Sequence, residues 1–498
     1  MDEQTRIDGH DTTLIATVMG TIRQRIGARS LTPGAKLPSI RALATSLRVS
    51  KSTVVEAYER LAAEGAIRSR PGSGYYVAAP LAPLSLTVIG PKLDREIDPL
   101  WISRQSLEAV DTLLKPGCGW LPASWMPQDG IRRALRTLSR ASDVALADYG
   151  TPLALPALRQ LLARRMGGHG IDVPAEQIIL AESGTQAIDL ICRFLIEPGD
   201  IVLVDDPCYF NFHALLRAHR AKVVSVTYTP TGPDVDLFAQ ALAEHRPRLY
   251  LTNSALHNPT GATLSPVVAH RVLKLADQFD LVIVEDDIFS DFEVTPAPRL
   301  AAFDGLERVI QIGSFSKTLS ASVRCGFIAA RPDWIEGLLD LKVATSFGGA
   351  SLSAELVLAL LKDGSYRKHM EALRQRLSRA RHDTIVRLKA IGIRPWIEPP
   401  AGLFLWCRLP DGLDAADIAR RALAEHIVLA PGNAFSLSQT ARSFMRFNVA
   451  QSTDPRIFTT LQRAMKRAER HAPSIAARST AGVHVRVFDR SRRGPVVE

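Results

Sequence analysis

The first 80 residues place apolar side chains at helical spacing, interrupted by short turns. In residues 15–26 the apolar positions recur every three or four residues, which gives a helix one apolar face. Two more amphipathic stretches, at residues 39–47 and 51–65, are joined by a three-residue turn. Residues 66–79 then alternate around a Gly-containing tip, as a β-hairpin does. Two short helices, a tight turn and a basic hairpin predict a winged helix-turn-helix domain.

Further along, short apolar runs alternate with longer segments of helical periodicity. The predicted strands are residues 178–180, 201–204, 222–226, 248–252, 281–285 and 308–312. Residues 185–196 and 265–279 are predicted crossover helices. This alternation predicts an α/β fold with a mainly parallel sheet covered by helices.

Length and composition indicate a globular protein of two or three domains. The chain has 498 residues, of which 46% are hydrophobic and 22% charged. Its five cysteines are scattered and lack the spacing of a metal site, so we expect reduced thiols and no metal. The polar start is unlike a secretory signal, and no apolar run reaches the roughly 18 to 20 residues that span a bilayer. We therefore expect a cytoplasmic protein without membrane segments.

The net charge of +10 is concentrated at the two ends of the chain. Residues 12–80 carry +7 and residues 465–498 carry +5, whereas residues 81–464 are nearly neutral at +1. A basic N-terminal domain suggests a polyanionic partner, and with the predicted fold that partner is double-stranded DNA. A three-helix bundle without DNA-binding function is the alternative.

The second predicted helix of the motif would enter the major groove by its N-terminal turn. Ser50, Lys51 and Ser52 would then meet phosphates and base edges. Arg41 on the preceding helix would contact the DNA backbone beside them, as would Arg70 and Gly72 in the hairpin.

Polar side chains follow the predicted strands of the large domain at their carboxyl ends, where ligands bind on such sheets. Singly each is a weak signal, and Lys317 alone could be a surface lysine in a Ser-rich loop. The residues in question are Ser183, Gly184, Thr185, Gln186, Tyr209, Asn258, Asp286, Ser314, Lys317 and Arg324. Together they supply a phosphate cradle, an aromatic face, an amide, a carboxylate, an amine and a guanidinium. Pyridoxal 5′-phosphate (PLP) requires this combination, because its aldehyde, ring nitrogen and phosphate each need a different partner.

Two resemblances support these hypotheses. Residues 33–77, PGAKLPSIRALATSLRVSKSTVVEAYERLAAEGAIRSRPGSGYYV, closely resemble the DNA-binding domain of GntR-family bacterial regulators. HNPTG, EDDIFSDF and SFSKTLSASVRCG resemble fold-type I aminotransferases, and the likeness extends over about residues 116–465. Together the two parts resemble the MocR subfamily of GntR regulators. The likeness implies a smaller C-terminal α/β subdomain and a homodimer with cofactor sites at its interface.

The resemblance assigns roles to individual residues. It implies that Lys317 forms a Schiff base with PLP, that Asp286 faces the pyridine nitrogen, that Asn258 donates to the 3-oxygen and that Tyr209 stacks on the ring. The phosphate would be surrounded by Ser183, Gly184, Thr185, Gln186, Ser314 and Arg324.

Two more residues acquire roles in the same way. Arg446, in SFMRFNVA, aligns with the arginine that takes a substrate carboxylate, and Tyr149, in DYGTP, with the tyrosine that reaches the phosphate across a dimer interface. The sequence departs from the family pattern after the Asp pair, with Ile288 and Phe289 where many relatives have tyrosine. It departs again at residues 154–155, which are Ala-Leu where Gly-Tyr is usual.

These observations predict four segments. They are a winged helix-turn-helix domain (12–78), a Pro-containing linker (79–115), a PLP-binding domain (116–470) and a basic, disordered tail (471–498). The favoured hypothesis is a transcription regulator that senses PLP, a small amino compound or both. An active aminotransferase with an accessory DNA-binding module is the main alternative. A scaffold that binds DNA without a cofactor is a third, disfavoured by the complete lysine, carboxylate and arginine set.

Overall fold

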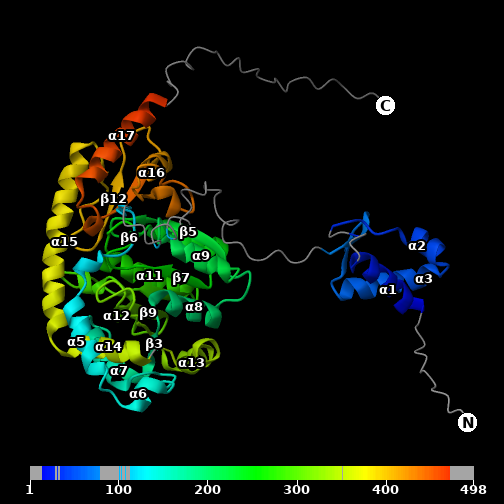
Figure 1. Ribbon diagram of the computed structural model, residues 1–498, viewed down its shortest axis with the longest axis horizontal. Coiled ribbons are helices and arrows are strands. Elements are labelled where there is room, and N and C mark those ends of the chain that lie inside the picture. Colours follow the sequence, from blue (N-terminus) through cyan, green and yellow to red (C-terminus); the bar gives the residue numbers. More distant parts are fainter. Residues whose placement is uncertain are drawn as a thin grey trace, which may run out of the picture. The chain divides into compact units, whose positions relative to one another are not determined.

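The computed structural model describes residues 14–27, 31, 34–78, 100, 103, 107, 113–349 and 351–471. Contacts divide the chain into two compact units, Met1–Ser85 and Leu86–Glu498 (Figure 1). Most of the predicted linker, and the predicted tail beyond residue 471, lie outside the described residues.

The small unit is a winged helix-turn-helix, as the sequence predicts. Its elements are α1 (Leu14–Gly27), α2 (Ile40–Leu47), α3 (Lys51–Ala63), β1 (Ile67–Arg70) and β2 (Gly74–Val77). Serine hydroxyls start the two short helices: Ser39 Oγ accepts the Ala42 N–H at 3.2 Å, and Ser50 Oγ accepts the Thr53 N–H at 3.1 Å. The antiparallel pair β1–β2 forms the wing.

A compact apolar core holds the small unit together. The helices contribute Val18, Ile22, Leu43, Val54 and Leu61, and the wing contributes Ile67 and Val77, all at most 2% exposed. Tyr58 is equally buried, and its hydroxyl donates to the Pro38 carbonyl at 2.8 Å, so its one polar atom is satisfied.

The large unit is built on an eight-stranded sheet of order β3-β10-β9-β8-β7-β4-β5-β6. Its strands are β3 (Ile178–Ala181), β4 (Ile201–Asp206), β5 (Lys222–Thr229), β6 (Gly232–Pro233), β7 (Leu249–Thr252), β8 (Val282–Asp286), β9 (Val309–Ser314) and β10 (Gly326–Ala329). The central strands are parallel, and β10 runs antiparallel between β3 and β9. The carboxyl ends of β4, β7, β8 and β9 therefore meet at one edge.

Helices cover both faces of this sheet, which explains why its strands are continuous apolar runs. The helices of this part are α5 (Gln128–Leu138), α6 (Asp143–Ala147), α7 (Pro156–Gly167), α8 (Gly184–Leu195), α9 (Phe210–Ala218), α10 (Val235–His245), α11 (Pro266–Gln278), α12 (Leu300–Asp304), α13 (Pro332–Ser346) and α14 (Ser351–Lys362). All five cysteines are buried and unpaired. Taken singly, none of the described helices has the length and apolarity to cross a bilayer; α13 and α14 meet those criteria only as a pair bent by 117°.

A second, smaller sheet follows in the chain. It has the order β11-β12-β14-β13, with β11 (Arg394–Pro395), β12 (Phe404–Arg408), β13 (Ala430–Pro431) and β14 (Phe444–Asn448). The helices here are α15 (Ser365–Ala390), α16 (Ala415–Leu423) and α17 (Pro455–His471). Figure 1 shows α15 running along the large unit past both sheets.

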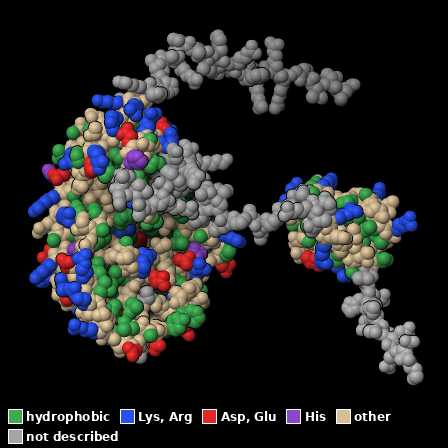
Figure 2. Space-filling model, in the orientation of Figure 1, with side chains coloured by type: hydrophobic (Ala, Val, Ile, Leu, Met, Phe, Trp, Pro, Cys, Tyr) green, Lys and Arg blue, Asp and Glu red, His purple; other side chains and the backbone are tan. Residues whose placement is uncertain are grey.

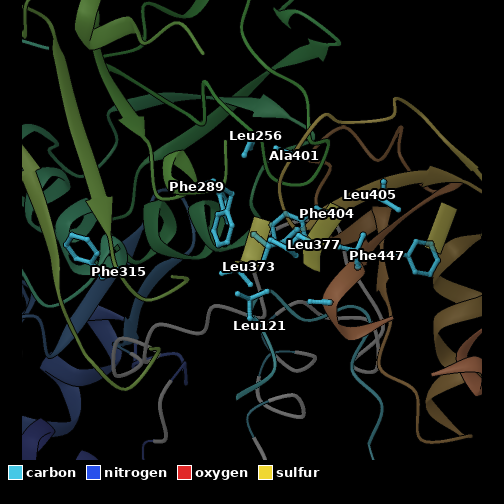
Figure 3. Close-up of a cluster of buried hydrophobic side chains, with 14 of the residues drawn as sticks. Leu121, Leu256, Phe289, Phe315, Leu373, Leu377, Ala401, Phe404, Leu405 and Phe447 are labelled. Atoms are coloured by element: carbon cyan, nitrogen blue, oxygen red, sulfur yellow. The ribbon is translucent and has the colours of Figure 1, made fainter. Parts of the chain in front are cut away.

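A buried apolar cluster joins the two sheets (Figure 3). Phe289, just after β8, meets Phe404 of β12 edge to face, with ring centres 5.6 Å apart. Leu373 and Leu377 of α15 lie in the same cluster. Because Phe289 is three residues beyond Asp286, this packing fixes the carboxyl end of β8 against the smaller sheet.

Candidate ligand site and nucleic-acid interface

A cavity of about 160 Å³ lies at the carboxyl ends of the parallel strands. Ten of the residues that the sequence proposes for a cofactor or ligand line it: Ser183, Gly184, Thr185, Tyr209, Asn258, Asp286, Ser314, Lys317, Arg324 and Arg446. They come from the carboxyl ends of five strands of the main sheet, or from the loops that follow them, and from β14 of the smaller sheet. The topology thus brings together residues up to 263 positions apart in the chain.

Lys317 follows β9, and its amine faces the cavity. Its Nζ donates to the Gly119 carbonyl at 2.8 Å. Burial lowers the pKa of this amine to about 8, and the positive charges of Arg446 and Arg324 act in the same direction. A lowered pKa leaves more of the amine neutral near pH 7, and the neutral amine is the form that attacks a carbonyl.

Asp286 ends β8 and is only 3% exposed. Its Oδ1 accepts the Ile288 N–H at 3.2 Å, and Asn253 Nδ2 donates to its main-chain carbonyl at 2.9 Å. Burial raises the pKa of the carboxyl to about 7. A cation held against this carboxylate would favour its charged form.

One end of the cavity has the features of a phosphate site. Ser183 caps α8 by accepting the Gln186 N–H at 3.0 Å, and the first N–H groups of the helix lie beside the cavity. The hydroxyls of Ser314 and Ser316 are 3.0 Å apart in the cavity wall, and Arg324 is exposed at its rim.

Close backbone packing shapes the same end of the cavity. A Cβ on Gly326 would lie 2.8 Å from the Gly313 carbonyl oxygen and from the Ser183 carbonyl carbon. A side chain at this position would therefore push β10 away from its neighbours.

Gln186 and Tyr149, both proposed from the sequence, do not line the cavity. Gln186 Oε1 accepts the Glu182 N–H at 2.6 Å, so its side chain supports the start of α8. Tyr149 is 85% exposed, and its ring centre lies 5.6 Å from that of Phe347, which is 68% exposed. Within one chain, Tyr149 is thus on the surface.

The structure shows where residues of the two departures from the family pattern lie. Phe289 packs in the cluster between the sheets and also lines the cavity. Ala154 has φ of 65°, a left-handed conformation that favours glycine, which accounts for the glycine usual at this position.

Arg446 is a buried cation without a carboxylate partner among the described residues. It is 1% exposed, and its Nη1 and Nη2 donate to Asn258 Oδ1 at 2.8 Å and to the Gly117 carbonyl at 2.7 Å. The guanidinium carbon lies 4.3 Å and 4.8 Å from the ring centres of Phe404 and Phe435. Among the described residues Nε has no hydrogen-bond partner, and burial lowers the pKa of the side chain to about 10. These features suit an incoming carboxylate.

A buried polar network behind the cavity was not foreseen from the sequence. Asp205 of β4 accepts hydrogen bonds from Tyr250 and Thr252 of β7, and its Oδ2 is 3.3 Å from His257 Nε2. The His257 ring stacks on Tyr228 with centres 3.9 Å apart. Since Tyr209 follows β4 and Asn258 follows His257, this network fixes two cavity residues relative to each other.

In the small unit, all six proposed DNA-contact residues are exposed. Lys51 and Ser52 lie in the first turn of α3 after its cap Ser50, and Arg41 lies in the first turn of α2. In the wing, Arg70 has its guanidinium carbon 4.5 Å from the ring centre of Tyr76, and Gly72 has φ of 71°. Lys and Arg side chains are visible on several parts of this unit's surface in Figure 2. The arrangement presents a helix N-terminus with cations beside it.

Two families match the two units. Residues 123–463 match the family described as aminotransferase class I and II, and residues 14–77 match the gntR family of bacterial regulatory proteins. The HTH-type transcriptional regulator YdcR of Escherichia coli (strain K12) is 30% identical over 86% of this chain and 93% of its own length. The HTH-type transcriptional regulator NorG of Staphylococcus aureus (strain USA300) is 28% identical over 80% of this chain and 92% of its own.

Solved structures share the fold of the large unit. LysN, the α-aminoadipate aminotransferase of Thermus thermophilus, was solved with N-(5′-phosphopyridoxyl)-L-leucine. It aligns with a TM-score of 0.67 and 27% identity over 74% of this chain and 95% of its own. The multiple substrate aminotransferase of Thermococcus profundus aligns with a TM-score of 0.65 and 27% identity over 73% and 94% of the two chains.

Replacement of Lys51 or Arg41 by alanine should weaken binding to double-stranded DNA. The plot of log K against log salt concentration has a negative slope, and each loss of a phosphate contact should reduce the magnitude of that slope by about one. Fluorescence anisotropy with a duplex of about 30 base pairs across a salt series measures this slope. Arg23→Ala, which removes a cation from α1, is the matched control and should leave the slope unchanged. Equal slopes for all four proteins would place the DNA contacts elsewhere.

Proposed function

The chain belongs to the MocR-type regulators, which join a GntR-family DNA-binding unit to a class I and II aminotransferase domain, and we propose that it regulates transcription in response to an amino compound bound with PLP. The observation that carries this proposal is the convergence on one cavity of an amine, a buried carboxylate and a guanidinium that has no carboxylate partner among the described residues. The chain also carries a DNA-binding unit with an exposed helix N-terminus. The site of action would be the cytoplasm, and the DNA a specific operator.

The cavity residues fit PLP. The first turn of α8, the serine hydroxyls and Arg324 would hold the phosphate, and Asp286 would take the ring nitrogen. Asn258 Oδ1 accepts from Arg446, and among the described residues its amide N–H₂ has no acceptor, so it can donate to the 3-oxygen. The aromatic ring of Tyr209 supplies a flat partner. When bound, PLP supplies an aldehyde that condenses with primary amines.

The protein's own residues would recognise an amino compound at two points. Arg446 binds and orients a carboxylate, using N–H groups that no described carboxylate occupies. Lys317, with its pKa lowered to about 8, can take up or release a proton at Nζ near neutral pH. Arg446 and the PLP aldehyde held at Lys317 would therefore select a ligand that carries both a carboxylate and a primary amine.

A short stretch of backbone, the junction segment (residues 113–120), could transmit ligand binding in the cavity to the DNA-binding unit. Its carbonyls at Gly117 and Gly119 accept hydrogen bonds from Arg446 and Lys317. The Gly117 N–H also donates to the Val428 carbonyl at 2.9 Å. A ligand that engages both cations alters the donors that hold this segment. Because the chain continues from residue 113 towards the small unit, such a change would bias the DNA-binding state.

A homodimer is part of the proposal. The exposed rings of Tyr149 and Phe347 form an apolar surface that a second subunit would cover. In that arrangement Tyr149 would approach the phosphate site of the partner, and two DNA-binding units would read paired half-sites.

The second candidate function is an active aminotransferase with an accessory DNA-binding module. The complete set of Lys317, Asp286 and Arg446 favours it. The fused DNA-binding unit favours the regulator, because transamination has no use for a domain that reads DNA.

Lys317 should be the lysine that holds PLP. Lys342 is a matched control, because it is 1% exposed, has its pKa lowered to about 8 by burial and does not line the cavity. After borohydride reduction of the PLP-loaded protein, peptide mass spectrometry should find the phosphopyridoxyl group at residue 317 and not at residue 342. Lys317→Ala should lose the visible absorbance band and Lys342→Ala should keep it, and both should bind non-specific DNA. A label absent from Lys317 would refute the assignment.

Loading with PLP should depend on pH through the Lys317 amine. Below the lowered pKa of about 8, each unit by which the pH falls reduces the fraction of neutral amine about tenfold. The rate of appearance of the visible band should rise with pH up to about 8 and then level off. A rate that keeps rising about tenfold per unit up to about pH 10, as for a solvated lysine peptide measured in parallel, would contradict the buried-amine assignment.

A further inference from the structure

The part of the cavity next to Arg446 is apolar and largely aromatic. Phe435 is fully buried, with its ring centre 4.8 Å from the Arg446 guanidinium carbon and 5.5 Å from the ring centre of Phe210. Phe210 in turn has its ring centre 5.0 Å from that of Tyr209. Ala430 and Ala434 belong to the same apolar cluster as Phe435 and complete this wall, and Trp120 also lines the cavity.

Small residues leave room beside these rings. Ala430 and Ala434, both less than 9% exposed, contribute only methyl groups to the wall next to Phe435. A ligand group of moderate size can therefore contact the aromatic faces without displacing backbone. Such contacts gain about 25 cal/mol for each Å² of apolar surface removed from water.

The charges that line the cavity are few, and most have a proposed partner. Among the described lining residues the cations are Lys317, Arg324 and Arg446, and the one carboxylate is Asp286. On the proposed function, Lys317, Arg324 and Asp286 serve PLP. Among the described lining residues, Arg446 is left as the single partner for a charged group of the ligand.

Charged side chains on the ligand would therefore be penalised. A second carboxylate would lack a cation, and a side-chain ammonium would lack a carboxylate, so each would be desolvated against Phe210 and Phe435 without compensation. Selectivity would then come from rejecting the wrong ligand as well as from binding the right one.

We infer that the ligand sensed in this cavity is an amino acid with a single carboxylate and an uncharged, apolar side chain, aliphatic or aromatic. The carboxylate binds Arg446, the amine is directed towards Lys317, and the side chain contacts the wall formed by Trp120, Phe210 and Phe435. This inference rests on the proposed function and specifies its ligand class.

The test uses the full-length protein loaded with PLP, titrated with individual amino acids while its visible band is followed. Leucine and phenylalanine should produce a half-maximal spectral change at concentrations about tenfold or more below those of aspartate, glutamate and lysine, whose side-chain charges lack a partner, and of γ-aminobutyrate, which has no side chain to contact the wall. Equal or tighter responses to any of these four would overturn the inference, and so would a persistent band that no amino acid alters. Absence of the band itself would instead count against the proposed function.

A pair of variants tests the wall directly. Phe210→Ala should weaken the responses to leucine and phenylalanine about tenfold while changing the response to alanine less than about threefold, because the small ligand does not reach the lost ring. Phe303→Ala removes an exposed phenylalanine of α12 outside the cavity and should leave the responses to leucine, phenylalanine and alanine unchanged. The visible band of each variant checks that the cofactor site is intact. Unchanged leucine and phenylalanine responses in Phe210→Ala would remove the wall from the recognition of the ligand.

Discussion

Lys317, Asp286 and Arg446 are charged side chains that the fold removes from water around one cavity without pairing them with each other. Asp286 and Arg446 are almost fully buried, and within the described part of the chain the hydrogen bonds of all three go to neutral groups. Withdrawing such charges from water costs on the order of several kcal/mol each unless an opposite charge compensates. Burial disfavours the charged form of each group, and for this reason the pKa is lowered for Lys317 and Arg446 and raised for Asp286. A ligand with a carboxylate and a cofactor with a protonated ring nitrogen would offset it.

This arrangement depends on both sheets of the large unit. The parallel strands β8 and β9 deliver the carboxylate and the amine to one edge, whereas Arg446 comes from β14 of the smaller sheet. The Phe289–Phe404 contact and the hydrogen bond from Arg446 to Asn258 fix the positions of the two sheets relative to each other at the cavity. A ligand bound there would therefore contact residues of both sheets and, through Arg446 and Lys317, would affect the junction segment.

Much of this site could be predicted from the sequence, for a physical reason. Parallel strands are apolar runs that end at one edge, so the polar residues that follow them, such as Asp286 and Lys317, must gather there. The winged helix-turn-helix could also be predicted from the sequence, because its helices are amphipathic and two of them begin at serine caps. Both folds are confirmed by the structure and the family matches.

Other features depend on tertiary contacts that leave no local pattern. The hydrogen bonds of Arg446 and Lys317 to Gly117 and Gly119 join residues 329 and 198 positions apart. The Asp205–His257 contact likewise crosses from a strand to a distant loop. Gln186 was proposed near the phosphate from its position in the first turn of α8. Its side chain instead accepts a backbone N–H, a competition between local and ligand hydrogen bonds that sequence position cannot resolve.

The central claim is that an amino compound in the cavity changes how the chain binds DNA. The most direct measurement is the dissociation constant of the PLP-loaded protein for a DNA duplex that it selects from a random-sequence pool. The constant is measured with and without saturating leucine. A coupling of about 1 to 3 kcal/mol predicts a change of roughly fivefold or more in the wild-type protein and none in Lys317→Ala. An unchanged constant in the wild type while leucine shifts the visible band, or an equal change in Lys317→Ala, would contradict the account.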